Sequence, residues 1–240
     1  MHKHFASVSW GKDSLCMLLI LLAKGEPLDE VVFFDTGMEF QAIYDTRDKV
    51  LPMLNEAGVA YTELYPEKPF LWNMFERPVT ERGGGTHNGY SWCGGRCRWG
   101  TTEKLRALDA HCKGIVYVGL AHDECERLKK ERADNKRFPL AEWGISEGEA
   151  LIYCYQQGHW WFESGVYLYA MLDRVSCWCC ANKNLKELRN YYRYLPQYWK
   201  KLKELQARTS RPFKKDFSLF ELEERFRQEF AGYPITVHAH

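Results

Sequence analysis

Residues 9–14, Ser-Trp-Gly-Lys-Asp-Ser, constrain the fold of this chain more than any other stretch. They follow an apolar run, His4–Val8, and precede a run of helical character, Leu15–Lys24. That order predicts a strand, a tight glycine turn and the N-terminus of a helix, where backbone N–H groups and the helix dipole favour a phosphate. A lysine and two serines add further donors. Because the Walker A spacing is absent, the sequence predicts a phosphate loop of another kind.

Short apolar or β-branched runs alternate with segments of helical character along the first half of the chain. The predicted strands are Phe5–Trp10, Glu30–Asp35, Ala60–Tyr65 and Gly114–Ala121, and the predicted helices are Leu15–Lys24, Phe40–Ala57 and Thr101–Cys112. Such alternation implies right-handed crossovers and a mostly parallel sheet. We therefore predict an α/β fold: a Rossmann-like open, mostly parallel twisted sheet with helices on both faces.

Two regions depart from this alternation. Residues 66–100 contain three consecutive glycines and several aromatic residues, which favours a functional insertion that faces a substrate or binds a metal. After residue 184, Leu185, Leu188 and Leu195 recur at helical spacing. We expect a nucleotide-binding domain over residues 1–184, with an insertion at about 66–100, and a helical C-terminal region over 185–240.

Composition restricts the compartment and the partners. No apolar stretch approaches the ~20 residues of a membrane span, and the first residues lack the pattern of a signal peptide. We expect a cytoplasmic protein without a membrane partner, whose nine cysteines stay reduced. A net charge of +1 predicts no general attraction to nucleic acid, so any such binding would use local patches.

Two cysteine clusters stand out, Cys93-Gly-Gly-Arg-Cys97 and Cys177-Trp-Cys179-Cys180. Four thiolates from two distant clusters suit zinc or an iron–sulfur cluster. We predict that the ligands are Cys93, Cys97, Cys177 and Cys180, with Cys179 as a competitor. Spacing alone leaves open Zn²⁺, a [4Fe-4S] cluster or unligated buried thiols. Cys16 is expected in the core, and Cys112, Cys125 and Cys154 have no predicted role.

The loop at residues 9–14 closely resembles the S-G-G-K-D-S pyrophosphate loop of the N-type ATP pyrophosphatases (PP-loop proteins), the superfamily that includes phosphoadenosine phosphosulfate (PAPS) reductases. The resemblance implies that a nucleotide contacts Ser9, Gly11, Lys12, Asp13 and Ser14. Trp10 stands where the family pattern has its first glycine, which requires that this position need no positive φ.

Two later segments resemble elements of the same family and extend the resemblance over about residues 4–190. Phe33–Phe40 resembles the D-T-G-x-x-F element, which implies that Asp35, Thr36 and Gly37 lie beside the nucleotide, with Asp35 suited to Mg²⁺. Gly119–Arg127 resembles the G-x-R-x-x-E-S-x-x-R element. It places Gly119, Asp123 and Glu124 at the nucleotide and Arg127 at an anionic group, although His122 and Cys125 depart from the pattern.

The resemblance favours an ATP-dependent adenylating enzyme that forms AMP and pyrophosphate and acts in sulfur transfer or thio-modification. The predicted catalytic residues are Lys12, Asp13, Asp35 and Arg127, and the cofactors are ATP, Mg²⁺ and the cysteine-bound zinc or cluster. The last cysteine is Cys180, whereas thiol-dependent PAPS reductases use one near their C-terminus. Two alternatives remain open: a sulfonucleotide reductase that uses an external thiol, and a non-catalytic nucleotide-binding module of a nucleic-acid-associated complex.

Nucleic acid, either tRNA or DNA, is a candidate substrate, and a sulfur-donor protein is a candidate partner. Residues 196–215 hold seven Lys or Arg against one Glu, and residues 77–106 hold six against two. Such patches suit backbone phosphates. The alternative is a solvated helical face balanced by the acidic residues of 216–230.

Overall fold

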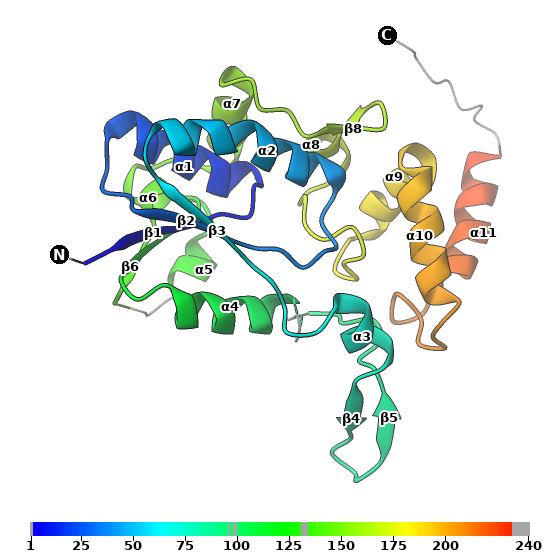
Figure 1. The fold of residues 1–240 in the computed structure, drawn as a ribbon. Coiled ribbons are helices and arrows are strands. Elements are labelled where there is room, and N and C mark those ends of the chain that lie inside the picture. The colour runs from blue at the N-terminus through cyan, green and yellow to red at the C-terminus, as the bar shows by residue number, and fades with distance from the viewer. Residues whose placement is uncertain (1, 96, 98–99, 131–133, 232–240) are drawn as a thin grey trace.

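A computed structural model describes residues 2–95, 97, 100–130 and 134–231. Its centre is a five-stranded parallel sheet in the order β3-β2-β1-β6-β7 (Figure 1). The strands are β1 (His4–Ser7), β2 (Glu30–Phe34), β3 (Ala60–Leu64), β6 (Ile115–Val118) and β7 (Lys136–Arg137). The predicted Rossmann-like α/β fold is confirmed.

Helices cover both faces of this sheet because its strands are apolar on both sides. On one face α1 (Lys12–Lys24) and α2 (Gln41–Glu56) pack on residues such as Ala6 and Val31. On the other face α4 (Gly100–His111) packs on Phe5, Val32 and Val116. Alternate residues of one strand therefore serve opposite layers.

Strand order determines where a ligand can bind. The chain runs from β1 outward through β2 to β3, and then returns to place β6 on the other side of β1. The carboxyl ends of β1 and β6 therefore form the topological switch point, where open α/β sheets bind ligands. The loop at residues 9–14 follows β1 at this point.

The predicted insertion at residues 66–100 contains regular structure. It forms a short helix, α3 (Phe70–Phe75), and an antiparallel hairpin of β4 (Pro78–Thr80) and β5 (Thr86–Asn88) that projects from the body (Figure 1). Gly89 ends the hairpin at φ 71°, where a Cβ would lie 2.1 Å from the carbonyl oxygen of Met74. Only glycine can make this close approach.

The segment between the sheet and the C-terminal helices forms short elements. They are α5 (Cys125–Leu128), α6 (Pro139–Glu142), α7 (Glu147–Gln156), the hairpin β8 (Phe162–Glu163) and β9 (Val166–Tyr167), and α8 (Leu168–Met171). Ser146 and Glu149 form a capping box that starts α7. This helix packs along α1.

The C-terminal region consists of α9 (Leu185–Tyr194), α10 (Pro196–Gln206) and α11 (Leu219–Phe230). It contacts the sheet domain through aromatic rings: Phe40, before α2, lies 4.8 Å from Tyr198 of α10, centroid to centroid. In the part of the chain that the structure describes, no helix is long and apolar enough to cross a membrane.

Candidate functional site

The loop between β1 and α1 is organised by its two serines. The backbone N–H of Ser9 donates to Oγ of Ser14 at 3.1 Å, and the Ser14 hydroxyl donates to the carbonyl of Gly11 at 3.1 Å. Helix α1 begins at Lys12, and Asp13 lies in its first turn. The predicted strand–turn–helix order is therefore present, with the strand ending at Ser7 rather than Trp10.

Trp10 adopts φ 59°, the left-handed region that favours glycine. The condition that this position need no positive φ is therefore not met. Its indole is fully buried beside the rings of Phe33 and Tyr61, and its carbonyl accepts a hydrogen bond from Nε1 of Trp161 at 2.8 Å. Packing and this hydrogen bond hold a conformation that costs a tryptophan about 1–2 kcal/mol.

The side chain of Lys12 is buried between two carboxylates. Its Nζ lies 2.7 Å from Oδ1 of Asp13 and 3.0 Å from Oε2 of Glu147. Burial raises the pKa of Asp13, and the charge of Lys12 opposes that rise. The backbone N–H of Lys12 donates to the hydroxyl of Tyr169 at 2.8 Å. Lys12, Glu147 and Tyr169 line a separate hollow of about 290 Å³, not the main cavity described next.

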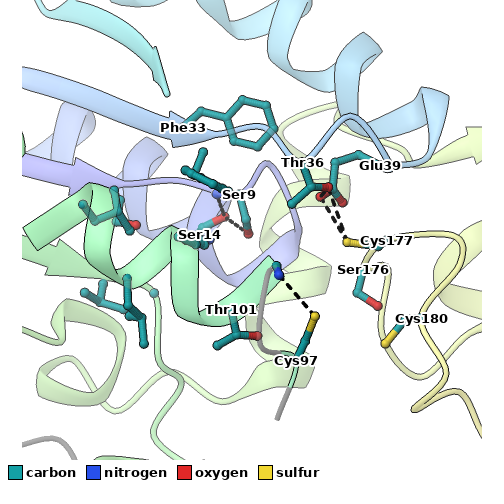
Figure 2. A pocket seen from close by; sticks show the side chains of 18 of the residues that line it. Ser9, Ser14, Phe33, Thr36, Glu39, Cys97, Thr101, Ser176, Cys177 and Cys180 are labelled. Carbon is teal, nitrogen blue, oxygen red and sulfur yellow. Dashed lines mark hydrogen bonds between the residues drawn. The ribbon is translucent and has the colours of Figure 1, made fainter. Parts of the chain in front are cut away.

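A cavity of about 500 Å³ lies at the switch point of the sheet (Figure 2). Its walls come from the loop serines, from residues that follow β2 and β6, from α4 and from both cysteine clusters. The lining includes Ser9, Ser14, Thr36, Glu39, Cys93, Cys97, Lys104, Gly119, Arg127, Cys177, Cys179 and Cys180. Only glycine fits at position 119, because a side chain there would clash with the loop. A Cβ at this position would lie 2.8 Å from both Cα and N of Ser14.

The Asp35-Thr36-Gly37 turn contributes Thr36 and Glu39 to this cavity, whereas Asp35 serves the turn itself. Oδ1 of Asp35 accepts hydrogen bonds from the N–H of Gly37 at 2.7 Å and from the hydroxyl of Tyr44 at 2.8 Å. The Thr36 hydroxyl donates to Oε1 of Glu39 at 2.9 Å. Burial raises the pKa of Glu39.

Glu39 and Lys104 are cavity residues that the sequence analysis missed. Glu39 lies within the Phe33–Phe40 element, but no role was predicted for it. Lys104 lies in a predicted helix, where nothing in the sequence distinguishes it from other lysines. Burial lowers the pKa of Lys104, and the nearby charge of Glu39 opposes that effect. Glu39 and Lys104 thus lie near the thiol of Cys177, and burial raises the pKa of that thiol.

Some residues of the segment after β6 line the cavity, and others hold the loop in place. Gly119 and Arg127 line the cavity. Asp123 accepts the first N–H of α7, from Glu147, at 3.0 Å. Glu124 accepts from the N–H of Ala121 and forms an ion pair with Arg127. The carboxylates of Asp123 and Glu124 thus hold the loop that presents the arginine.

The four predicted ligand cysteines line the same cavity although some eighty residues separate the clusters. Sγ of Cys97 accepts the N–H of Gly100 at 3.2 Å, at the start of α4, and Cys177 donates to Oε1 of Glu39 at 3.5 Å (Figure 2). Among the described residues, no three His, Cys, Asp or Glu side chains are arranged to hold a metal ion. The thiols share a cavity in this conformation without a preformed tetrahedron.

The remaining cysteines lie elsewhere. Cys16 is buried, as expected for a core residue; Cys112, for which no role was predicted, is also buried, and Cys125 is exposed on α5. Cys154, for which no role was predicted, donates its thiol to the carbonyl of Lys12 at 3.3 Å and lies beside Cys16. It thereby supports the first turn of α1.

Comparison with known proteins finds a matching family model and a similar protein. A family model described as the phosphoadenosine phosphosulfate reductase domain matches residues 3–144. An uncharacterized protein of Methanocaldococcus jannaschii is 29% identical over 202 residues, which cover 80% of this chain but 39% of that protein. This chain thus spans about two fifths of the length of that relative.

Among solved structures, a U34-tRNA thiolase from Methanococcus maripaludis, determined with its [4Fe-4S] cluster, aligns over 100% of this chain and 76% of its own. The TM-score is 0.46 at 12% sequence identity.

Proposed function

We propose, on the premise that this chain belongs to the phosphoadenosine phosphosulfate reductase domain family, that it is an ATP-dependent adenylating enzyme of sulfur transfer. The observation that carries the proposal is the shared cavity. Ser9 and Ser14 of the phosphate loop line the same 500 Å³ as both cysteine clusters. A nucleotide bound at the loop would therefore place its reacting phosphate in the space that the thiols face.

In this proposal the nucleotide phosphates take the hydroxyls of Ser9 and Ser14 and the N–H groups at the start of α1. Gly11 leaves room for the Tyr169 hydroxyl, Gly37 adopts a φ of 73°, and Gly119 keeps the end of β6 against the loop. Thr36 and Arg127 line the cavity on its other sides. Arg127 offers a planar cation to an anionic group of the substrate.

Asp13 and Asp35 are the residues that would hold Mg²⁺, because carboxylate oxygens are its preferred ligands. When bound, Mg²⁺ would neutralise charge on the phosphate oxygens. Lys12 would act on the same charge. In the described conformation its ammonium is shared by Asp13 and Glu147, so a bound polyphosphate must compete with Glu147 for it.

The proposed chemistry has two steps. An oxygen of the acceptor attacks the α-phosphorus of ATP, a P–O bond forms, and the bond to the bridging oxygen breaks with pyrophosphate as leaving group. Hydrosulfide supplied by a donor then attacks the activated carbon, the C–S bond forms and the C–O bond breaks, and AMP leaves with that oxygen. Loop amides and Lys12 stabilise the negative charge of the leaving pyrophosphate. The donor and the acceptor, tRNA or DNA, are separate partners.

The thiols of Cys93, Cys97, Cys177 and Cys180 would hold zinc or a [4Fe-4S] cluster, since both prefer cysteine sulfur. Such a centre would supply either a structural link between the insertion and the segment before α9 or a site for sulfur. Closure of the two clusters on each other would be needed, and two hydrogen bonds of 2.7 Å between Gly95 and Asn182 already link the segments that carry them. Lys183, buried near Cys180, would balance the thiolate charge.

The test is an anaerobic assay of ATP labelled at the α-phosphate, with the products separated. AMP and pyrophosphate support the proposal, and ADP and phosphate contradict it. Sulfite released from PAPS or adenosine phosphosulfate with an external thiol would instead identify a sulfonucleotide reductase, which the same cavity would suit. ATP binding without turnover, together with a co-purifying partner, would identify a non-catalytic module.

A further inference from the structure

The main cavity holds two charged side chains that the proposed adenylation step leaves without a role, Glu39 and Lys104. Glu39 lies in the turn after β2, and Lys104 lies in the second turn of α4. A charged group inside a protein has lost solvation, so it needs a partner that offsets this loss. The contacts of these two residues indicate that their partner is a ligand.

Lys104 lies on the inward side of α4. The cavity-lining residues of this helix include Thr101, Lys104, Leu105 and Leu108. Their spacing places them on one side of the helix. Burial lowers the pKa of Lys104. Within the described chain its ammonium forms no hydrogen bond or ion pair, although Nζ keeps surface that is accessible from the cavity. An oxygen of a ligand would supply the missing acceptor.

The carboxylate of Glu39 is held by one of its two oxygens. Oε1 accepts hydrogen bonds from the hydroxyl of Thr36 at 2.9 Å and from the thiol of Cys177 at 3.5 Å (Figure 2). No described residue donates to Oε2, which also keeps accessible surface. The cavity therefore contains an oriented carboxylate with one free acceptor oxygen.

Glu39 and Lys104 do not neutralise each other by direct contact. The charge of Glu39 reaches Lys104 and favours its ammonium form, yet these two described side chains form no ion pair. By contrast, Nζ of Lys12 lies 2.7 Å from Oδ1 of Asp13. A free acceptor and a free donor thus stand apart in one cavity, which suits a ligand that presents a donor next to an acceptor.

A lactam, which is a –CO–NH– group in a planar ring, presents such an edge. Its N–H would donate to Oε2 of Glu39, and its carbonyl oxygen would accept from Nζ of Lys104. Both would be charge-assisted hydrogen bonds, which are stronger than neutral ones. Apolar side chains, Phe34 and Leu105 among them, line the same cavity and suit the faces of a flat ring.

The proposed reaction also favours a lactam as the acceptor. When the carbonyl oxygen forms its P–O bond and pyrophosphate leaves, the ring nitrogen forms a C=N bond and gives up its proton. Oε2 of Glu39 would take that proton, and Lys104 would stabilise the negative charge that develops on the oxygen. A carbonyl beside a ring nitrogen without hydrogen, as in cytosine, releases no proton and does not need the carboxylate.

We propose that Glu39 and Lys104 select a lactam nucleobase as the acceptor by binding its N–H and its carbonyl oxygen inside the main cavity; this inference rests on the proposed function for the reaction itself. An amino acid is the competing ligand, because its ammonium and carboxylate would also match the two side chains. The apolar lining favours the flat ring over the zwitterion.

The experiment measures nucleoside binding to the full chain, purified anaerobically with its metal and saturated with α,β-methylene-ATP, whose α–β bridge cannot be cleaved. Saturation-transfer NMR gives the dissociation constants of uridine, 3-methyluridine and cytidine. Uridine has the lactam N–H, the methyl group of 3-methyluridine replaces that hydrogen, and cytidine has none at the same nitrogen. Uridine is expected to bind at least about tenfold more tightly than the other two, the value of one hydrogen bond to a charged group.

Two variants test the two residues. Glu39→Gln offers an amide that can donate to the ring nitrogen of cytidine, so the preference for uridine is expected to fall below about threefold. Lys104→Met keeps a long side chain without the charge and is expected to weaken uridine binding about tenfold. Asp109→Asn, at another carboxylate that lines the cavity, is the matched control and should keep the preference. Urea unfolding checks that each variant is folded, and the methylated nucleoside tests the wild type without any substitution.

Equal affinity of the wild type for uridine and 3-methyluridine overturns the proposal, and so does the absence of saturable nucleoside binding. A preference for uridine that survives Glu39→Gln, or that Asp109→Asn reduces equally, overturns it as well. Displacement of uridine by millimolar glutamate or cysteine would identify an amino-acid site and would also overturn it.

Pyrophosphate release from ATP, measured on the same proteins, separates this inference from the proposed function. Wild-type protein that forms AMP and pyrophosphate but does not prefer uridine refutes the inference alone. Protein that binds uridine through Glu39 and Lys104 but forms ADP and phosphate refutes the adenylation proposal and leaves the two residues as a lactam-binding pair.

Discussion

The hydroxyl of Tyr169 accepts a hydrogen bond of 2.8 Å from the backbone N–H of Lys12, the first residue of α1. A side chain from 157 residues further along the chain thus occupies the position that a phosphate oxygen would take at this helix N-terminus. In the proposed function, a bound nucleotide would therefore compete with this contact for the same donor.

Tyr169→Phe is therefore expected to leave the N–H of Lys12 without its partner and to favour the nucleotide-bound state. One neutral hydrogen bond is worth about 1 kcal/mol, so the affinity for a non-hydrolysable ATP analogue should rise by about fivefold, while the free protein loses about 1 kcal/mol of stability. Calorimetric titration and urea unfolding measure the two quantities. An unchanged affinity would mean that the phosphates do not use this amide.

Lys12→Ala is expected to reduce pyrophosphate formation by at least about 100-fold, because in the proposed mechanism this lysine stabilises the charge of the leaving pyrophosphate. It also leaves Asp13 and Glu147 without their shared counter-ion, so stability must be measured beside activity. Lys186→Ala removes an exposed lysine that lines the same small hollow and is the matched control. Equal losses of activity in the two variants would contradict a specific role for Lys12.

Single serine substitutions of Cys93, Cys97, Cys177 and Cys180 are expected to reduce bound metal after anaerobic purification. Cys125→Ser, on the exposed surface of α5, should leave the metal content unchanged. Metal analysis, sulfide analysis and absorbance distinguish iron–sulfur from zinc. If the metal content falls in Cys179→Ser but not in Cys180→Ser, the fourth ligand is Cys179 and not Cys180.

Gly119→Ala is expected to destabilise the protein by about 1–3 kcal/mol and to abolish nucleotide binding, because its methyl group would displace the first turn of α1 at Ser14. Gly148→Ala in α7 meets nothing within 4 Å and is expected to stabilise the protein by about 0.5 kcal/mol. Urea unfolding compares both with the wild type. A nucleotide affinity that survives Gly119→Ala would place the ligand away from the end of β6.

The C-terminal helices provide a pH-dependent test of the fold. Oε2 of Glu229 in α11 lies 2.6 Å from Nε of Arg189 in α9, and this arginine, with Arg225, lowers the pKa of Glu229 to about 2. Because the folded pKa is below the unfolded value, the stabilisation is fully present above about pH 4.5 and is lost as pH falls toward 2.

Glu229→Gln should thus cost less than about 1 kcal/mol at pH 7, since the pair is partly exposed, and its difference from wild type should shrink below pH 4.5. Glu224→Gln, which breaks a pair within α11 alone, is the control. A difference that grows in acid would contradict this assignment. Urea unfolding at several pH values supplies the measurement.

Much of the sheet could be predicted from the sequence because buried parallel strands are apolar on both faces and glycine marks the turn after the first. Residues 66–100 were harder: the α3 helix and the β4–β5 hairpin are short, and all three residues of β5 are exposed, so neither has the periodicity that identifies longer elements.

The candidate site was predictable only where its residues lie in local motifs. The roles of Tyr169 and Glu147 at Lys12 depend on how α7 and α8 pack against α1, which no local pattern encodes. The conformation of Trp10 could not be predicted locally either, because tertiary packing holds this residue at a positive φ that a tryptophan disfavours.

The buried indole of Trp10 has a consequence for how a ligand meets the loop. A glycine in its place would sample many backbone conformations in the ligand-free protein, and phosphate binding would have to restrict the loop to one of them. Here the aromatic core and Trp161 have already selected the shape. If the loop captures an anion as proposed, the backbone at Trp10 would therefore lose little chain entropy on binding.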